Sequence, residues 1–293
     1  MPETDVTDLL KAGLHFGHQT RRWNPRMGRY IWGERDGIHI IDLLQTQELL
    51  DDARDFAADV SRRGGTVLFV GTKKQARDGI EEWAKRSGMP YVNQRWLGGL
   101  LTNFHTISKR IERLHELDQL KTDGQLDLLP TKERMSMEAE LEKLTYNLGG
   151  VRDMERLPQA VVIIDLKTEA IALREAERLR IPIIGLVDSN VDPVPVDYPV
   201  PGNDDAIRSC NLVIGTIGQA VTDAASTYRA EEERRRAEEE ERRRAEEEAK
   251  RKAEEERKAR EEAEKAAAEA AQQAQAAEGG EQAPAAATEQ EKS

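Results

Sequence analysis

Cysteine is nearly absent from this 293-residue chain, and long apolar runs are missing altogether. The single cysteine, Cys210, excludes an intrachain disulfide and a zinc site made of several thiolates. No uninterrupted apolar segment approaches the roughly 18 residues that a membrane-spanning helix needs. The first residues, Met1-Pro-Glu-Thr-Asp, lack the basic-then-apolar pattern of a secretory signal. We therefore expect a cytoplasmic protein in a reducing compartment, with no membrane association.

Positive charge is also in deficit, but it is concentrated in one place. The net charge is -12, and residues 229–293 alone carry 15 basic and 21 acidic side chains. A polyanion such as RNA responds to the local charge of a surface rather than to the average over the chain. Residues 11–35 contain one acidic side chain, Glu34, and six basic ones, which are Lys11, Arg21, Arg22, Arg26, Arg29 and Arg35. This segregation indicates one basic surface on an otherwise acidic protein.

The order of apolar runs and helical patterns predicts the fold class. Short, β-branched apolar runs that are typical of buried parallel strands occupy residues 66–71, 160–165 and 182–187, with further candidate strands at 212–215 and 39–41. Helical patterns alternate with them at 43–62, 73–87, 168–180 and after Gly218. This alternation predicts an α/β fold with a doubly wound, mainly parallel sheet. The body would comprise residues 1–104 and 151–228.

Residues 105–150 interrupt the alternation and are expected to form an insertion. Apolar residues recur there at spacings of three and four on both sides of a polar turn, at Ile107, Ile111, Leu114, Leu117 and Leu120 and then at Met137, Leu141, Leu144 and Leu148. This pattern predicts an antiparallel coiled-coil hairpin. The alternative is two ordinary helices packed on the sheet. One apolar stripe per helix, however, leaves little surface for both a partner helix and a sheet.

The C-terminal part is expected to form a separate, charged tail. Residues 229–265 place glutamate four residues before arginine repeatedly, as in Glu232 and Arg236, which supports a single solvated helix. Residues 266–293 are rich in Ala, Gln and Glu and include Gly279-Gly280 and Pro284, which predicts a low-complexity, disordered segment. We assign this tail no binding role, because a charge run is usually a solvated surface.

Arginines and aromatic rings are interleaved between Leu14 and Met27, and Tyr30 and Trp32 follow closely. Guanidinium, indole and amide groups in a segment interrupted by glycine and proline suit phosphates, 2′-hydroxyls and exposed bases. The alternative is a surface loop that is merely soluble. Solubility alone, however, does not favour three large rings among arginines. We predict that this segment contacts RNA.

The segment Gly71-Thr-Lys-Lys-Gln-Ala76 follows a predicted strand and opens a helix, a position at which α/β folds bind phosphate. It lacks the second glycine of a Walker A loop and the three spaced glycines of a dinucleotide loop. Lys73 and Lys74 are therefore expected to meet RNA phosphates. The alternative function is a nucleotide-binding α/β enzyme or switch that uses the Gly71–Lys74 loop. The sequence contains no nucleophile elbow and no H-E-x-x-H motif, so we predict no enzyme activity and no catalytic residue.

Two further groups of residues are candidate sites. Arg95-Trp96 precedes Gly98-Gly99, so a cation and a ring lie beside a flexible backbone; Trp96 is as compatible with the core as with RNA. His15-x-x-His18 has a spacing that suits a metal, and a zinc or magnesium site would be completed by Asp188, Asp204 and Asp205. Histidines that are satisfied within the fold are the alternative. No cofactor is required.

Taken in order, several long segments are similar to the S-two family of small-subunit ribosomal proteins. The resemblance covers residues 5–228. It rests on Leu9-Leu-Lys-Ala-Gly-Leu-His-Phe-Gly-His18, Trp23-Asn-Pro-Arg-Met27, Phe69-Val-Gly-Thr-Lys-Lys-Gln-Ala76, Asn93-Gln-Arg-Trp-Leu-Gly-Gly-Leu-Leu-Thr-Asn103, Pro158-Gln-Ala-Val-Val-Ile-Ile-Asp165, Pro182-Ile-Ile-Gly-Leu-Val-Asp-Ser-Asn190 and Pro201-Gly-Asn-Asp-Asp-Ala-Ile-Arg208. The tail after Tyr228 is not explained by it.

The resemblance implies a flavodoxin-like body with a coiled-coil hairpin of the bacterial and organellar type, located on the ribosome. It implies contacts with small-subunit rRNA and other small-subunit proteins, and support for small-subunit ribosomal protein one, which holds mRNA. We do not expect a homo-oligomer. The resemblance and the motifs above together make the RNA-binding candidates Lys11, Arg21, Arg22, Trp23, Asn24, Arg26, Arg29, Lys73, Lys74, Arg95, Trp96 and Asn103.

Overall fold

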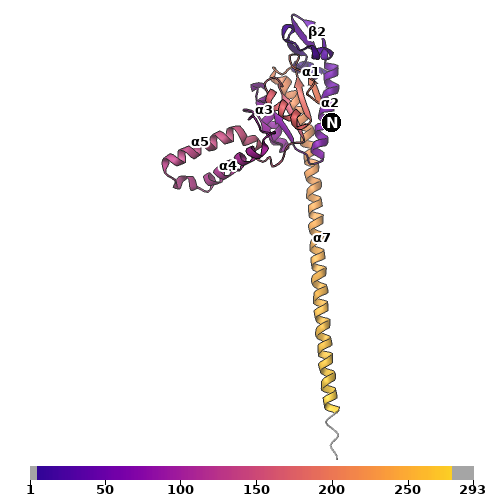
Figure 1. Cartoon of the computed structure of the whole chain (residues 1–293). Coiled ribbons are helices and arrows are strands. Elements are labelled where there is room, and N and C mark those ends of the chain that lie inside the picture. Colours follow the sequence, from indigo (N-terminus) through magenta and orange to yellow (C-terminus); the bar gives the residue numbers. More distant parts are fainter. Residues whose placement is uncertain (1–4, 279–293) are drawn as a thin grey trace, which may run out of the picture. The chain divides into compact units, whose positions relative to one another are not determined.

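The computed structural model describes residues 5–278 and divides the chain into two units, residues 1–230 and 231–293 (Figure 1). Unit 1 contains a five-stranded parallel sheet. Its strands are β4 (Val67–Val70), β5 (Tyr91–Val92), β6 (Ala160–Ile164), β7 (Ile183–Val187) and β8 (Tyr198–Pro201). They are arranged in the order β5-β4-β6-β7-β8, which is the 2-1-3-4-5 order of flavodoxin-like folds. The prediction of a parallel α/β sheet is confirmed.

Both faces of this sheet are buried, which explains why its strands are continuous apolar runs. Along β4, Val67 and Phe69 belong to one apolar cluster, and Leu68 and Val70 belong to another. The first cluster includes residues of α2 (Leu43–Arg62), α3 (Lys74–Ser87) and the first turns of α7 (Ile207–Glu278). The second includes residues of α6 (Ala170–Leu179) and of the hairpin helices. The sheet therefore lies between two helical layers.

The N-terminal segment forms a second, smaller sheet. After α1 (Val6–Ala12), strands β1 (Phe16–Gln19), β2 (Ile31–Arg35) and β3 (Ile38–Ile41) pair antiparallel in the order β1-β3-β2. The 3-10 helices η1 (Thr20–Arg22) and η2 (Pro25–Tyr30) connect β1 to β2. Residues 39–41 are thus a strand, as predicted, but they belong to this sheet and not to the parallel one.

The predicted strand at residues 212–215 is wrong, because these residues lie within α7. Val213, Ile214, Ile217 and Val221 are buried together against the first face of the sheet. Counted from Val213, the other three lie one, four and eight residues further along, which follows the helical period. The fifth strand is instead β8, which contains Pro199 and Pro201 and lies at the edge of the sheet. Proline is tolerated there because an edge strand need not donate every backbone hydrogen bond.

Helices α4 (Phe104–Thr122) and α5 (Thr131–Leu148) form the predicted helical hairpin, joined through η3 (Gln125–Leu128) and followed by η4 (Gly149–Val151). Figure 1 shows the two helices side by side, and their residues contact each other. Ile111, Leu114 and Leu117 of α4 and Leu141 of α5 are buried in one cluster. Coiled-coil packing of this pair stays a prediction.

The second unit continues as α7, with i,i+4 ion pairs such as Glu232 to Arg236, 2.8 Å, and Glu240 to Arg244, 2.6 Å. The helix extends to Glu278, so the prediction of disorder from residue 266 is wrong for 266–278. Alanine, the strongest helix former, dominates these residues. Residues 279–293 of the predicted disordered tail lie outside the described residues. Among residues 5–278, no helix is both long enough and apolar enough to cross a bilayer.

Candidate nucleic-acid interface and carboxylate cluster

The connection between β1 and β2 carries the exposed basic side chains that the sequence predicted. Arg21 and Arg22 lie on η1 and are exposed, and Trp23 is 40% exposed with its ring tilted against His39. Trp32 on β2 is 77% exposed. Rings and guanidinium groups therefore reach the surface of one small sheet, where they can stack on bases and pair with phosphates.

The arginines of this face differ in how strongly they are engaged within the chain. Arg21 donates only to the neutral side chain of Gln19, at 3.0 Å, and Arg22 has no ion pair within the part of the chain that the structure describes. Arg26 pairs with Asp192, and the guanidinium of Arg29 lies 4.7 Å from the ring centre of Tyr30. Arg21 and Arg22 are thus the most available for phosphate.

The remaining two candidates of this segment are engaged locally. The Lys11 ammonium pairs with Asp8 at 3.1 Å on the surface of α1. The side chain of Asn24 accepts the backbone N–H of Arg26 and caps η2. An N-cap contributes about 1 kcal/mol to a helix start. Asn24 therefore has a structural role whether or not it meets RNA.

The small sheet is fixed to the carboxyl end of β7 through Ser189. The hydroxyl of Ser189 accepts the backbone N–H of His18 at 2.8 Å, and its carbonyl accepts that of Asn24 at 2.8 Å. A Cβ atom at Gly17 would lie 2.8 Å from the Ser189 hydroxyl, so only glycine permits this approach. The basic face is thereby attached to the carboxyl end of β7.

A group of aspartates around Lys73, the carboxylate cluster, lies at the carboxyl edge of the parallel sheet, beside β4 and β6. In a 2-1-3-4-5 sheet the direction of winding reverses between these two strands, and ligands bind at that point. Here the Lys73 ammonium lies 3.0 Å from Asp165, 2.7 Å from Asp204 and 2.8 Å from Asp205. This placement weakens Lys73 as a candidate for contact with RNA phosphates, because its charge is already neutralised within the fold; the RNA contact of Lys73 stays a prediction.

The carboxylates of this cluster raise the pKa of the cations that they contact. Burial disfavours the Lys73 ammonium, but hydrogen bonds to Asp204 and Asp205 outweigh burial and raise the pKa of Lys73 above its ordinary value. The pKa of Asp204 is itself raised to about 7, first by burial and then by the charges of Asp188 and Asp165. Asp204 is 2% exposed. Asp204 therefore binds a proton more readily than an isolated aspartate does, whereas burial is outweighed at Asp165 by hydrogen bonds from Thr168 and Lys73, which lower the pKa of Asp165.

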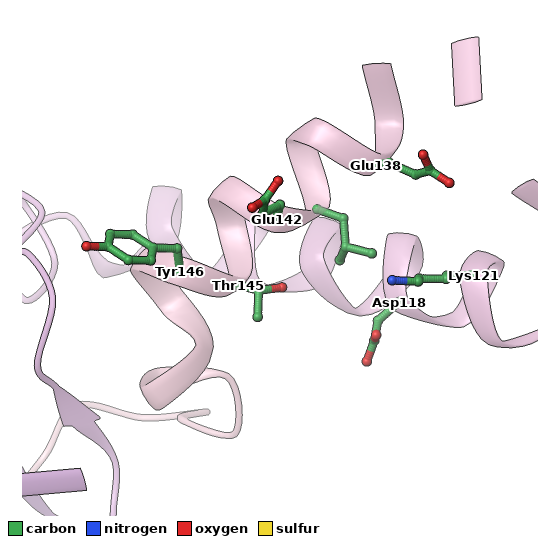
Figure 2. Close-up of a pocket in the computed structure, with 7 residues that line it drawn as sticks. Asp118, Lys121, Glu138, Glu142, Thr145 and Tyr146 are labelled. Atoms are coloured by element: carbon green, nitrogen blue, oxygen red, sulfur yellow. The ribbon is translucent and has the colours of Figure 1, made fainter. Parts of the chain in front are cut away.

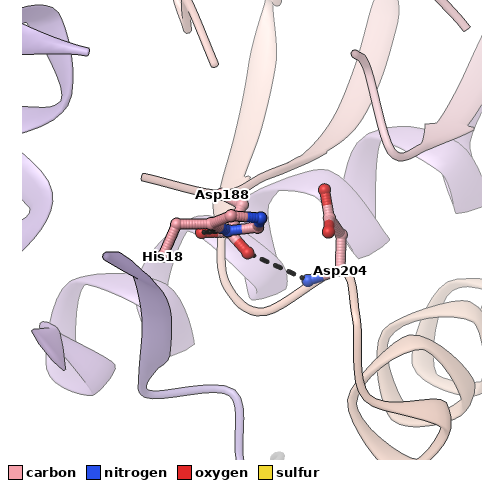
Figure 3. Close-up of side chains that lie close together, drawn as sticks. All are labelled: His18, Asp188 and Asp204. Carbon is pink, nitrogen blue, oxygen red and sulfur yellow. Dashed lines mark hydrogen bonds and ion pairs between the residues drawn. The ribbon is translucent and has the colours of Figure 1, made fainter. Parts of the chain in front are cut away.

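Four of the five predicted metal ligands come together here. His18 Nδ1 lies 3.0 Å from Asp188 and Nε2 lies 3.5 Å from Asp205. Ligand atoms of His18, Asp188 and Asp204 all lie within 4.8 Å of one another (Figure 3). The hydrogen bond that the His18 imidazole donates to Asp188 is the first cause of the raised pKa of His18. One imidazole and two carboxylates are a donor set that suits zinc.

His15, the fifth predicted ligand, is not part of this group. Its ring lies 3.9 Å from that of Phe16, measured between ring centres. Its Nδ1 atom is buried and has no hydrogen-bond partner among the residues that the structure describes. Burial lowers the pKa of His15. The His15-x-x-His18 spacing therefore does not form a site, because His18 lies within β1 and His15 directly precedes this strand, so that the two residues do not share a helical turn.

The Gly71–Lys74 loop is unsuited to a nucleotide. The backbone N–H and the hydroxyl of Thr72 both donate to the carboxylate of Glu169, the first at 2.9 Å. Glu169 is 2% exposed, and burial raises its pKa. A carboxylate thus occupies the donors that a phosphate would need. Lys74, in contrast, is exposed at the start of α3.

The segment between β5 and α4 is organised by one buried carboxylate that sequence reasoning missed. Glu175 of α6 accepts the Trp96 indole N–H at 3.1 Å and the backbone N–H groups of Gly99, Leu101 and Thr102 at 2.7, 3.1 and 3.0 Å. The Thr102 hydroxyl donates as well, at 3.0 Å. The sequence feature that could have revealed this carboxylate is an acidic residue at position 175 on the apolar face of a helix, between Ala172 and Ala176.

Three RNA-binding candidates, Arg95, Trp96 and Asn103, belong to the segment that Glu175 organises. Trp96 is 7% exposed, so the prediction of a direct RNA contact for it is wrong and the core interpretation is confirmed. Arg95 and Asn103 at the two ends of the segment are exposed. Asn103 precedes α4 and accepts a hydrogen bond from the Thr106 hydroxyl at 3.0 Å.

Strand order and charge distribution together define a class of protein. This is a flavodoxin-like α/β protein whose usual ligand-binding edge is filled by its own carboxylate cluster, and whose basic side chains gather on a separate small sheet. A family model described as Ribosomal protein S2 matches residues 9–224. The chain belongs to the ribosomal protein S2 family, whose members are structural components of the small ribosomal subunit, associated with rRNA and other small-subunit proteins, and not enzymes.

Proposed function

We propose that the chain binds small-subunit rRNA through the basic face that surrounds η1. The observation that carries this proposal is the exposure of Arg21 and Arg22 without a carboxylate partner among the described residues, beside the exposed ring of Trp23. Arg26, Arg29 and Asn24 extend this face, and Lys11, Lys74, Arg95 and Asn103 are further candidate contacts on unit 1. Docking onto a folded RNA surface needs only one basic face, which is compatible with a net charge of -12.

The salt dependence of binding tests this face directly. Each phosphate that a protein neutralises adds roughly 0.7–0.9 to the slope of log affinity against log salt concentration. The double variant Arg21→Ala/Arg22→Ala should therefore flatten the slope by roughly 1.5 units when the chain binds small subunits that lack it. The matched control is Arg242→Ala/Arg243→Ala, which removes the same charge from exposed positions of α7. An unchanged slope in the first variant would refute the assignment of this face.

We also propose that the bound chain supports docking of small-subunit ribosomal protein one, and thereby mRNA binding. Family membership supports this role, since it places the chain among proteins that assemble on the small subunit. Subunits reconstituted with and without the chain should differ in how much protein one they retain after sedimentation. Equal retention would refute this part of the proposal and leave the rRNA contact untouched.

A divalent ion at His18, Asp188 and Asp204 is a further part of the proposal. The convergence of their ligand atoms supports it. Such an ion would compete with Lys73 for Asp204, because the ammonium already lies 2.7 Å from that carboxylate. When bound, the ion would brace β1 against the carboxyl edge of the sheet and would take no part in a reaction.

A further inference from the structure

A groove lies between the two helices of the hairpin, α4 and α5. It is lined by Asp118 and Lys121 of α4 and by Glu138, Leu141, Glu142, Thr145 and Tyr146 of α5 (Figure 2). Leu141 is 6% exposed and forms the apolar part of the lining. Carboxylates, a lysine and an aromatic ring surround it. The groove thus combines an apolar centre with a polar rim.

The rim holds negative charge that the hairpin does not neutralise. Glu138 and Glu142 are four residues apart on α5, where like charges repel each other. Neither forms an ion pair within the described part of the chain, although Glu140 between them pairs with Arg113 at 3.5 Å. The third carboxylate of the rim, Asp118, forms an ion pair with Arg152 at 3.1 Å. The repulsion between Glu138 and Glu142 destabilises the isolated hairpin, and a cation from a binding partner would relieve it.

The ring of Tyr146 specifies what kind of cation would fit. Tyr146 follows Glu142 by four residues, so that the two side chains lie on one side of α5, and Tyr146 is 58% exposed. A guanidinium can stack on an aromatic face and pair with a carboxylate at the same time. An ammonium would form the ion pair but would stack less well. The pair Glu142 and Tyr146 therefore favours arginine.

We propose that this groove docks an arginine-bearing segment of a neighbouring small-subunit protein, with an apolar side chain against Leu141 and an arginine between Glu142 and Tyr146. RNA fits poorly, because its phosphates would face Asp118, Glu138 and Glu142, and of the residues that line the groove only Lys121 is basic. The proposal goes beyond the rRNA contact of the η1 face and uses a different part of unit 1. The two can therefore fail independently.

Site-specific photocrosslinking tests which molecule occupies the groove. Tyr146 is replaced by a photoreactive phenylalanine analogue in the full chain, which is then assembled into purified small subunits that lack it. We expect a crosslink to one small-subunit protein, mapped by mass spectrometry to a segment that contains arginine. A crosslink to rRNA, to a second copy of this chain, to a protein segment without basic residues, or to nothing overturns the proposal.

Charge reversal tests the role of the carboxylates. Glu138→Lys/Glu142→Lys should reduce the yield of the crosslink from position 146 by at least tenfold. The control Glu112→Lys/Asp123→Lys makes the same change in charge at exposed residues of the hairpin that do not line the groove, and should leave the yield within twofold. The rRNA salt slope should be the same for both variants, which verifies that each is folded and bound. Equal crosslinking by both variants would refute the proposal.

Discussion

Removal of the Glu175 carboxylate should destabilise unit 1 more than any other single truncation on α6. The side chain receives five hydrogen bonds, from the Trp96 indole, from three backbone N–H groups between Gly99 and Thr102, and from the Thr102 hydroxyl. In Glu175→Ala these donors lose their acceptor while they remain partly or wholly buried. No other acceptor replaces it without movement of the segment between β5 and α4.

The size of the effect follows from the hydrogen bonds that are lost. A hydrogen bond to a charged group contributes about 1.5–3 kcal/mol. The five bonds share one acceptor and the segment can relax, so their effects do not add. We expect the free energy of unfolding to fall by about 3–5 kcal/mol, near the upper end for single substitutions.

Denaturant unfolding followed by tryptophan fluorescence measures this change, because Trp96 contacts Glu175 directly. Glu175→Gln retains one acceptor oxygen and should lie between the wild type and Glu175→Ala. Glu177→Ala, on an exposed position of the same helix, is the control and should change stability by less than about 0.5 kcal/mol. If Glu175→Ala also stays within that limit, the carboxylate does not organise the segment.

The same residue should make stability sensitive to acid. Burial raises the pKa of Glu175, but hydrogen bonds from Thr102, Gly99, Trp96 and Leu101 together outweigh burial and lower it below the ordinary value of 4.5. A carboxyl group with a lowered pKa in the folded state stabilises the fold fully above the pKa of the unfolded state and loses this contribution as pH falls. The advantage of the wild type over Glu175→Gln should therefore be constant near neutral pH and shrink below about pH 4.5.

Two further outcomes are expected. Gly150→Ala should lower the free energy of unfolding by about 1–3 kcal/mol, because its Cβ atom would lie 2.2 Å from the carbonyl oxygen of Tyr91. The control is Gly149→Ala, whose Cβ atom would have its nearest neighbour at 3.8 Å and which should be nearly neutral in the same urea titration. Equal effects of the two substitutions would contradict this explanation. Chain purified without an affinity tag should contain zinc or magnesium by elemental analysis and lose it in Asp188→Asn, whereas a wild type without stoichiometric metal would remove the ion from the proposal.

Features that depend on neighbours along the chain were accessible from the sequence. The pattern over residues 43–62 predicted α2 with its observed bounds, Leu43–Arg62. The continuous apolar runs predicted β6 and β7, since a strand buried on both faces has no polar side to alternate with. The run at 212–215 was misassigned for the same reason. Four consecutive apolar or small residues satisfy a buried strand and a buried helix equally well.

The candidate site was only partly predictable. Exposure of Arg21 and Arg22 followed from their place in a polar, proline-interrupted segment. The ion pairing of Lys73 did not, because it depends on Asp204, which is 131 residues away in the sequence. Trp96 could have faced either way until its partner, Glu175, 79 residues further along, was placed. Lysine and tryptophan each combine an apolar body with a polar end, so neither has a fixed preference for surface or core.

The sequence by itself determined the fold class, the hairpin insertion, the charged tail and the concentration of arginine near the N-terminus, because composition and periodicity act over a few residues. The tertiary structure decided which charges remain available to a partner. It neutralised Lys73 within the carboxylate cluster, buried Trp96 against Glu175, and left Arg21, Arg22, Glu138 and Glu142 without ion pairs among the described residues. The reason is that the free energy of a charge depends on what surrounds it in space, and those surroundings come from distant parts of the chain.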